Sequence, residues 1–471
     1  MNSNVKVIGK ITLPAKATVF YTLTGALERG MTLIFTPIFT RILSPEEFGL
    51  YPRYVSWMGI LTVILTLELS GSVIYKGLVK YKHREGEFLS SAFGIITLLT
   101  LSAIFVAVLF GDLLYLLTGL SKSVMVFLIL QIYLNGVANL FFAKCRFFYK
   151  YKLASMLNVV SAILSPTLSL LVIRFSIYKS EGRIIGPLAI SALIVIPIIC
   201  SILKGSSAIF NKEIWKYIFT FTLPLILHFL SSSIIAQSGK IFVGRYFGNG
   251  ALARYSLVFS LGFLFTVVTG GISSGLSPWI NRKLSHGAGH IIDITAEKLF
   301  SVFAILTLIA TAFIPEGLSV LAPLEYRSYL SAVYPLSISV LLSFLSTTLY
   351  TVILYYEKGR LISTCSIFTA ALTLFLHLTI TKRFGYLAAA FVQIVASAIT
   401  VLSYALILGG VLKKHTFKAR KYVMTFLLCS TGSFLLSYFR NSILSRILFF
   451  SALILMLIPK AIECYRLIKE K

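Results

Sequence analysis

Long apolar segments follow one another along almost the whole chain, and they set the strongest limit on its fold. Each is long enough for a helix to cross the hydrocarbon core of a bilayer, which takes about 20 residues. Connections of about 20 residues or fewer separate them and leave no room for a soluble domain. The sequence therefore predicts an all-α polytopic membrane protein with about 14 transmembrane helices. The expected spans are residues 18–43, 52–75, 88–110, 123–143, 153–174, 185–203, 217–243, 253–280, 299–320, 329–356, 361–380, 386–410, 422–438 and 447–463.

Composition leads to the same class. Of 471 residues, 57% are hydrophobic and only 13% are charged, so a soluble protein of this length would expose far too much apolar surface. The formal net charge of +27 would suggest nucleic acid as a partner in a soluble protein. Here we assign it to cytoplasmic loops and a cationic cavity, and we expect no nucleic-acid partner. The five cysteines show no CxxC spacing, so neither a disulfide framework nor a metal site is indicated, and we expect no cofactor.

The distribution of basic residues predicts the orientation of the chain. With the N-terminus inside, 28 Lys and Arg residues fall in the inner segments and 14 in the outer ones. Cytoplasmic loops of membrane proteins carry such an excess of Lys and Arg. We therefore expect both termini in the cytoplasm.

A weak internal repeat links the two halves of the chain. A shift of 204 residues superimposes Arg41 on Arg245 and Tyr51 on Tyr255, with five more identities in the same helix-loop-helix region. Six predicted helices separate the copies, so both have the same orientation in the membrane. This predicts two six-helix bundles related by a parallel repeat, with the substrate path between them. The expected domains are residues 1–210 and 211–412 for the two bundles and 413–471 for two additional C-terminal helices.

Charged side chains occur at membrane depth in the first two predicted helices. Glu28 and Arg29 are adjacent, so their side chains point about 100° apart and cannot pair along one face. Glu68 lies in the second predicted helix. In one interpretation, Arg29 faces a substrate phosphate, and Glu28 or Glu68 binds a coupling H+ or Na+. In the other, these groups form a structural interhelical ion pair, for which Arg29 and Glu68 are the candidate partners.

Polar residues also mark later helices. Gln131, Asn135 and Asn139 recur every four residues and therefore share one face of the fourth predicted helix. They line a sugar path or hydrogen-bond to neighbouring helices, and the sequence does not decide between these. Asn158, in the next helix, is a lone polar residue that we assign to an interhelical contact.

The seventh predicted helix carries Lys240, and Arg245 follows near its outer end. Long basic side chains at such a position reach the membrane interface, or they meet a phosphate that emerges there.

Two segments carry a family resemblance. PIFTRILSPEEFGLY, from Pro37 to Tyr51 at the end of the first predicted helix, resembles the N-terminal signature of Wzx-type polysaccharide flippases, which belong to the multidrug/oligosaccharidyl-lipid/polysaccharide exporter superfamily. QSGKIFVGRYFGNGALARYS, from Gln237 to Ser256, is similar to that family's seventh helix. Gly239 stands before Lys240 where the family usually has an Asp, so we place no Asp-based ion site there.

The resemblance implies a transport function and no enzyme activity. Such proteins move an oligosaccharide linked to undecaprenyl diphosphate from the inner to the outer leaflet by alternating access, for O-antigen, capsule or exopolysaccharide synthesis. The implied partners are this lipid-linked cargo, membrane lipids, H+ or Na+, and other membrane proteins of polysaccharide assembly. A lipid II flippase and a cation or drug antiporter of the same superfamily are alternatives. A multipass glycan polymerase or ligase fits less well because the predicted outer loops are short.

Overall fold

The computed structural model describes residues 13–204, 209–262, 266–287, 289–413, 417, 419–439 and 442–469. These residues are almost entirely helical, and none of them lies in a strand. Nine helices of this part of the chain are long and apolar enough to cross a membrane. The predicted all-α polytopic membrane fold is therefore confirmed, whereas the number of about 14 spans stays a prediction.

The chain divides into two compact units. Unit 1 contains the chain up to Ile38 and residues 64–222, and unit 2 contains residues 39–63 and 223–471. The domain boundaries expected from the sequence stay a prediction. Three helices contribute to both units, namely α1 (Leu13–Ile42), α2 (Pro45–Thr66) and α9 (Lys212–Gly262).

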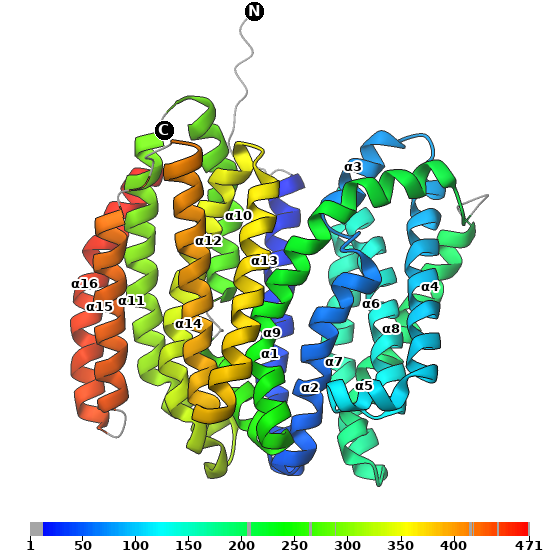
Figure 1. The fold of residues 1–471 in the computed structure, drawn as a ribbon, viewed down its shortest axis with the longest axis horizontal. Helices are drawn as coiled ribbons and strands as arrows, with labels where there is room; N and C mark the ends of the chain where they lie inside the picture. Colours follow the sequence, from blue (N-terminus) through cyan, green and yellow to red (C-terminus); the bar gives the residue numbers. More distant parts are fainter. Residues whose placement is uncertain are drawn as a thin grey trace, which may run out of the picture. The chain divides into compact units, whose positions relative to one another are not determined.

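Unit 1 is organised around α6 and α8. Helix α8 packs against both α6 and α7, and α4 packs against α6 (Figure 1). A side chain at Gly186 of α8 would overlap Ser165 and Ser169 of α7, so this glycine allows the two backbones to approach closely. Apart from its parts of α1, α2 and α9, unit 1 contains α3 (Ser72–Lys80), α4 (Glu85–Leu109), α5 (Gly111–Thr118), α6 (Lys122–Phe147), α7 (Tyr151–Phe175) and α8 (Lys179–Lys204).

Unit 2 is organised around α12, which contacts α10, α11, α13, α14 and α15. Its core contains the fully buried Phe300, Phe303 and Phe344, and the rings of Phe303 and Phe344 lie 5.0 Å apart. Apart from its parts of α1, α2 and α9, unit 2 contains α10 (Thr266–Ser285), α11 (Gly289–Leu321), η2 (Leu324–Ala332), α12 (Val333–Tyr355), α13 (Gly359–Leu376), η3 (His377–Thr381), α14 (Lys382–Leu406), η4 (Ile407–Val411), α15 (Ala419–Tyr438) and α16 (Ile443–Lys469).

Helices α15 and α16 pack against α11 at one side of unit 2 (Figure 1). Arg446 of α16 is only 8% exposed and forms two contacts with the carboxylate of Glu316 on α11, at 2.7 and 2.6 Å. The same guanidinium donates to the carbonyl of Ala312 at 2.9 Å. A buried cation is stable only with such partners, so this cluster fixes α16 to α11.

The second predicted helix is interrupted, which corrects the placement of Glu68. Helix α2 ends at Thr66 and α3 begins at Ser72, and Leu67 and Glu68 between them have left-handed φ values of 50° and 49°. The N–H of Gly71 donates to the carbonyl of Glu68 at 3.0 Å, a turn hydrogen bond in place of a helical one. Glu68 therefore lies in a turn and not inside a continuous helix.

A second interruption lies within α9. Gly248 has φ 85° and ψ −179°, so the helix bends there into two helical parts. Ser44, between α1 and α2, precedes Gly248 by 204 residues, the same shift as in the sequence repeat. Tyr51 lies in the helix that follows the break at Ser44, and Tyr255 lies in the helical part that follows the bend at Gly248. The two breaks agree with the predicted repeat in position.

Candidate functional site

A polar cavity of ≈ 260 Å³ lies between α6, α7 and α8 of unit 1, and we call it the amide cavity. Half of its ten lining residues carry an amide or a hydroxyl group, and none of the ten carries a charge. Apolar side chains complete the wall. The lining residues are Asn135, Ala138, Asn139, Phe142, Leu157, Asn158, Ser161, Ser191, Ile194 and Val195.

Capping and packing of α6 fix the positions of the amide side chains on that helix. Ser121 caps the helix by accepting a hydrogen bond from the N–H of Val124, and the 26-residue helix contains no proline. Leu128, Ile132 and Val137 are fully buried and anchor it within unit 1. Since residues four positions apart lie on one helix face, this packing points Asn135 and Asn139 into the same cavity.

Gln131 lies one helical turn before Asn135 and braces the cavity wall. Its Nε2 donates to Asn135 Oδ1 and to Ser191 Oγ, both at 2.9 Å, so it ties α6 to α8. The side chain is buried, and its Oε1 accepts no hydrogen bond within the described structure. Gln131 thus makes the interhelical contact considered for the polar stripe, while Asn135 and Asn139 line the cavity.

Sequence reasoning missed most of the cavity wall. Asn158, which we had assigned to an isolated interhelical contact, lines the amide cavity together with Ser161 and Ser191. Asn139 and Asn158 make no side-chain hydrogen bond to other described residues. Polar residues at similar depth in three successive helices are the signal that could have revealed this cavity.

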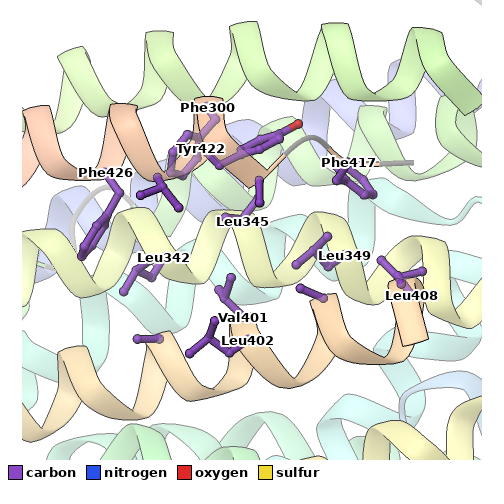
Figure 2. A pocket seen from close by; sticks show the side chains of 15 residues that line it. Phe300, Leu342, Leu345, Leu349, Val401, Leu402, Leu408, Phe417, Tyr422 and Phe426 are labelled. Atoms are coloured by element: carbon purple, nitrogen blue, oxygen red, sulfur yellow. The ribbon is translucent and has the colours of Figure 1, made fainter. Parts of the chain in front are cut away.

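A second cavity, of ≈ 290 Å³, lies in unit 2, and we call it the apolar cavity. Figure 2 shows side chains of α11, α12, α14 and α15 surrounding it, almost all of them hydrocarbon. Tyr422 is the one lining residue with a polar side-chain atom, and its hydroxyl donates to Asp293 Oδ1 at 3.1 Å. This cavity has the opposite chemistry to the amide cavity.

The charged residues singled out in the first two helices are not paired with one another. Arg29 is exposed and Glu28 is half-buried on α1. Within the part of the chain that the structure describes, no ion pair joins Arg29 to Glu28 or Glu68. The Arg29–Glu68 pair considered above is not formed in this structure: Glu68 lies in the turn after α2, and its side chain makes no ion pair with Arg29.

The basic residues of the seventh predicted helix have different surroundings within unit 2. Lys240 is half-buried, and its Nζ lies 4.9 Å from the ring centroid of Phe259, a cation–π distance. Arg245 is exposed close to the bend at Gly248. The aromatic contact means that Lys240 does not simply extend away from the protein, as a side chain that reaches the interface would.

Two comparisons relate the sequence of this chain to known proteins. The family model for polysaccharide biosynthesis proteins matches residues 15–284. An uncharacterized membrane protein of Haemophilus influenzae is 23% identical over 361 residues, which cover 72% of this chain and 84% of that protein.

Two solved structures have a similar fold. The lipid II flippase MurJ in an inward closed conformation gives a TM-score of 0.66 at 15% identity, covering 96% of this chain and all of that one. An inward-facing multidrug resistance MATE family transporter of the MOP superfamily gives 0.63 at 15% identity, covering 87% and 98%.

The structural similarity establishes the fold of this transporter superfamily, and the family match extends over more than half of the chain. Both findings confirm the resemblance noted from the sequence. The chain is a multi-pass membrane protein that belongs to the polysaccharide biosynthesis protein family.

Proposed function

We propose that this protein flips an oligosaccharide linked to undecaprenyl diphosphate from the cytoplasmic to the outer leaflet of the bacterial cytoplasmic membrane. It does so by alternating access, in the synthesis of a cell-surface polysaccharide such as O-antigen, capsule or exopolysaccharide. The observation that carries the proposal is the family match over residues 15–284 of a chain with a transporter fold.

The chemistry of the two cavities supports an amphiphilic cargo. Such a cargo has a hydroxylated head, an anionic diphosphate and a long hydrocarbon tail. Amide and hydroxyl groups line the cavity of unit 1, whereas hydrocarbon lines the cavity of unit 2. The net charge of +27 favours an anionic cargo over a cationic drug.

Individual residues receive roles within this proposal. Arg29, Lys240 and Arg245 stabilise the diphosphate on its path, because a cation lowers the cost of bringing phosphate to membrane depth. Asn135 and Asn139 belong to the sugar path, and Gln131 holds Asn135 in place beside it. Glu28 and Glu68 bind the coupling H+ or Na+. Both termini lie in the cytoplasm, and other membrane proteins of polysaccharide assembly act beside the flippase.

Transport of lipid II is the second candidate function. The fold similarity to a lipid II flippase favours it. The two functions differ in the glycan, so a direct comparison of cargoes separates them.

The test is flipping by the purified chain in proteoliposomes. The vesicles contain either a fluorescent undecaprenyl-diphosphate-linked oligosaccharide or fluorescent lipid II, and a membrane-impermeant quencher reports which leaflet holds the label. We expect faster movement of the oligosaccharide-linked lipid than in protein-free vesicles. Faster movement of lipid II alone would select the second function, and no acceleration of either lipid would refute both.

A further inference from the structure

We propose that the amide cavity is a binding subsite for a single uncharged sugar residue of the cargo. The inference rests on the proposed function and assigns a substrate class to one part of it. It involves Asn158, Ser161 and Ser191 as well as the two amides of α6.

Hydrogen bonding around Gln131 determines what the cavity offers to a ligand. Because Asn135 Oδ1 and Ser191 Oγ both accept from Gln131 Nε2, the amide N–H of Asn135 and the hydroxyl of Ser191 are left to donate. The carboxamides of Asn139 and Asn158 each supply an acceptor and two further donors. A sugar hydroxyl donates and accepts at once, so it matches this mixed lining.

The absence of charge in the wall restricts the ligand further. None of the ten lining residues is ionisable, so an anionic sugar would bury its carboxylate without a counter-charge. Burying an unpaired charge is far more costly than burying a hydrogen-bonded hydroxyl. The cavity therefore selects neutral sugars over uronic acids.

Size and shape point to one sugar ring. The volume of ≈ 260 Å³ lies just below the range of ligand pockets, which starts at roughly 300 Å³. Phe142 presents an aromatic side chain in the wall, against which the C–H groups of a sugar ring pack. Asn139 is exposed, so one edge of the cavity is accessible from outside unit 1.

Polar groups without partners are costly at membrane depth, and this argues for a ligand in the transport cycle. Asn158 is half-buried in α7 and has no side-chain hydrogen-bond partner among the described residues. A residue that served only to join helices would form a hydrogen bond with a neighbouring helix through its amide, as Gln131 does with Ser191. Asn158 instead lines the cavity.

The experiment measures binding of free sugars to the full chain in lipid nanodiscs by calorimetry. The neutral probes are glucose, galactose, mannose, rhamnose, N-acetylglucosamine and N-acetylgalactosamine, and the charged probe is glucuronate. We expect at least one neutral sugar to bind and glucuronate to bind about tenfold more weakly or not at all. Asn135→Leu and Asn158→Leu should each weaken the binding of the neutral sugar about tenfold.

Two further variants separate a binding defect from a folding defect. Ser161→Ala removes one cavity hydroxyl without adding volume and should weaken sugar binding by a smaller factor. Gln393→Leu removes a buried amide of unit 2 and should leave binding unchanged. Size-exclusion profiles and thermal unfolding show whether each variant is folded.

The inference is overturned if no neutral sugar binds, if glucuronate binds equally well, or if the cavity variants bind like the parent. A heat of NaCl binding that is lost in Asn135→Leu and Asn158→Leu, without any response to sugars, also overturns it, because the cavity would then be a cation site. The flipping assay distinguishes the two proposals. Sugar binding without flipping refutes only the proposed function, and flipping without sugar binding refutes only the subsite.

Discussion

The neighbouring residues Glu28 and Arg29 differ in exposure although they share one turn of α1. Glu28 is half-buried and Arg29 is exposed, as expected for side chains that point about 100° apart. A guanidinium at membrane depth is rarely left to face lipid, since it binds anions strongly and is costly to desolvate. Under the proposed function, the exposed cation of α1 is a binding group for the diphosphate of the cargo.

Replacement of Arg29 tests this role. Arg29→Ala should abolish export of the glycan in cells while leaving the amount of protein in the membrane unchanged, because the diphosphate loses a counter-charge. Arg29→Lys should restore part of the export, since it keeps the charge but loses the bidentate geometry. Surface display of the glycan and immunoblots of membrane fractions measure the two quantities.

Arg174→Ala is the matched control for Arg29. Arg174 is also exposed, but it lies in the last turn of α7. A basic residue at a helix end interacts with the helix dipole and the membrane interface, so its loss should leave export nearly unchanged. Full complementation by Arg29→Ala would show that Arg29 has no essential contact with the cargo.

At the scale of residues, the sequence identified polar and charged side chains within apolar helices, but it predicted their neighbours less well. A four-residue spacing was sufficient to place Asn135 and Asn139 on one face, and both line the amide cavity. Asn158 was not recognised as their neighbour, because contacts between helices depend on rotations about the helix axes that hydropathy does not determine. Glu68 was misplaced because a hydropathy window averages over the short break at residues 67–71.

At the scale of elements, two glycines with positive φ mark bends inside long helical stretches. Gly248 in α9 has φ 85° and Gly385 in α14 has φ 78°, and both helices continue on either side. With extended ψ values, these conformations are open almost only to glycine. The sequence contains many glycines within apolar segments and does not indicate which of them have a positive φ, so the bends could not be predicted from it.

Alanine substitution tests whether the backbone conformation at position 248 requires glycine. No atom lies within 4 Å of a Cβ added at Gly248, so Gly248→Ala causes no clash and isolates the cost of the backbone conformation. We expect destabilisation by about 1–3 kcal/mol, seen as a lower unfolding temperature of the purified protein. Gly317→Ala in α11 also has open space but a helical backbone, and it should be neutral or stabilising by up to about 1 kcal/mol. Equal unfolding temperatures for the two variants would contradict this account of α9.

At the scale of the whole molecule, the described residues form cavities of opposite polarity in the two units. One is lined by amides and hydroxyls in unit 1, and the other by hydrocarbon in unit 2. The overall class was predictable from hydropathy and length, because an apolar chain can satisfy its backbone inside a membrane only as helices or a closed barrel. The cavities were not predictable, since each forms where three or more helices meet and leave space between their side chains.

The apolar cavity makes a prediction about the lipid part of the cargo. Ala405 of α14 lines this cavity, so Ala405→Trp would fill part of it with an indole ring. If the cavity receives the isoprenoid chain, the variant should slow flipping of the undecaprenyl-linked cargo several-fold in proteoliposomes. A cargo with a short ten-carbon isoprenoid should move at the parental rate, because its tail is too small to need the filled space.

Leu406→Trp provides the control for this substitution. Leu406 is the next residue of α14 and is 71% exposed, but it does not line the apolar cavity. It therefore adds the same ring to the same helix without filling the space, and it should flip both cargoes at parental rates. Sugar binding in unit 1 should be unchanged in both variants, because the two cavities lie in separate units. If Ala405→Trp slows the two cargoes equally, the cavity has no role specific to the long chain, and the substitution acts through the packing of α11, α12, α14 and α15.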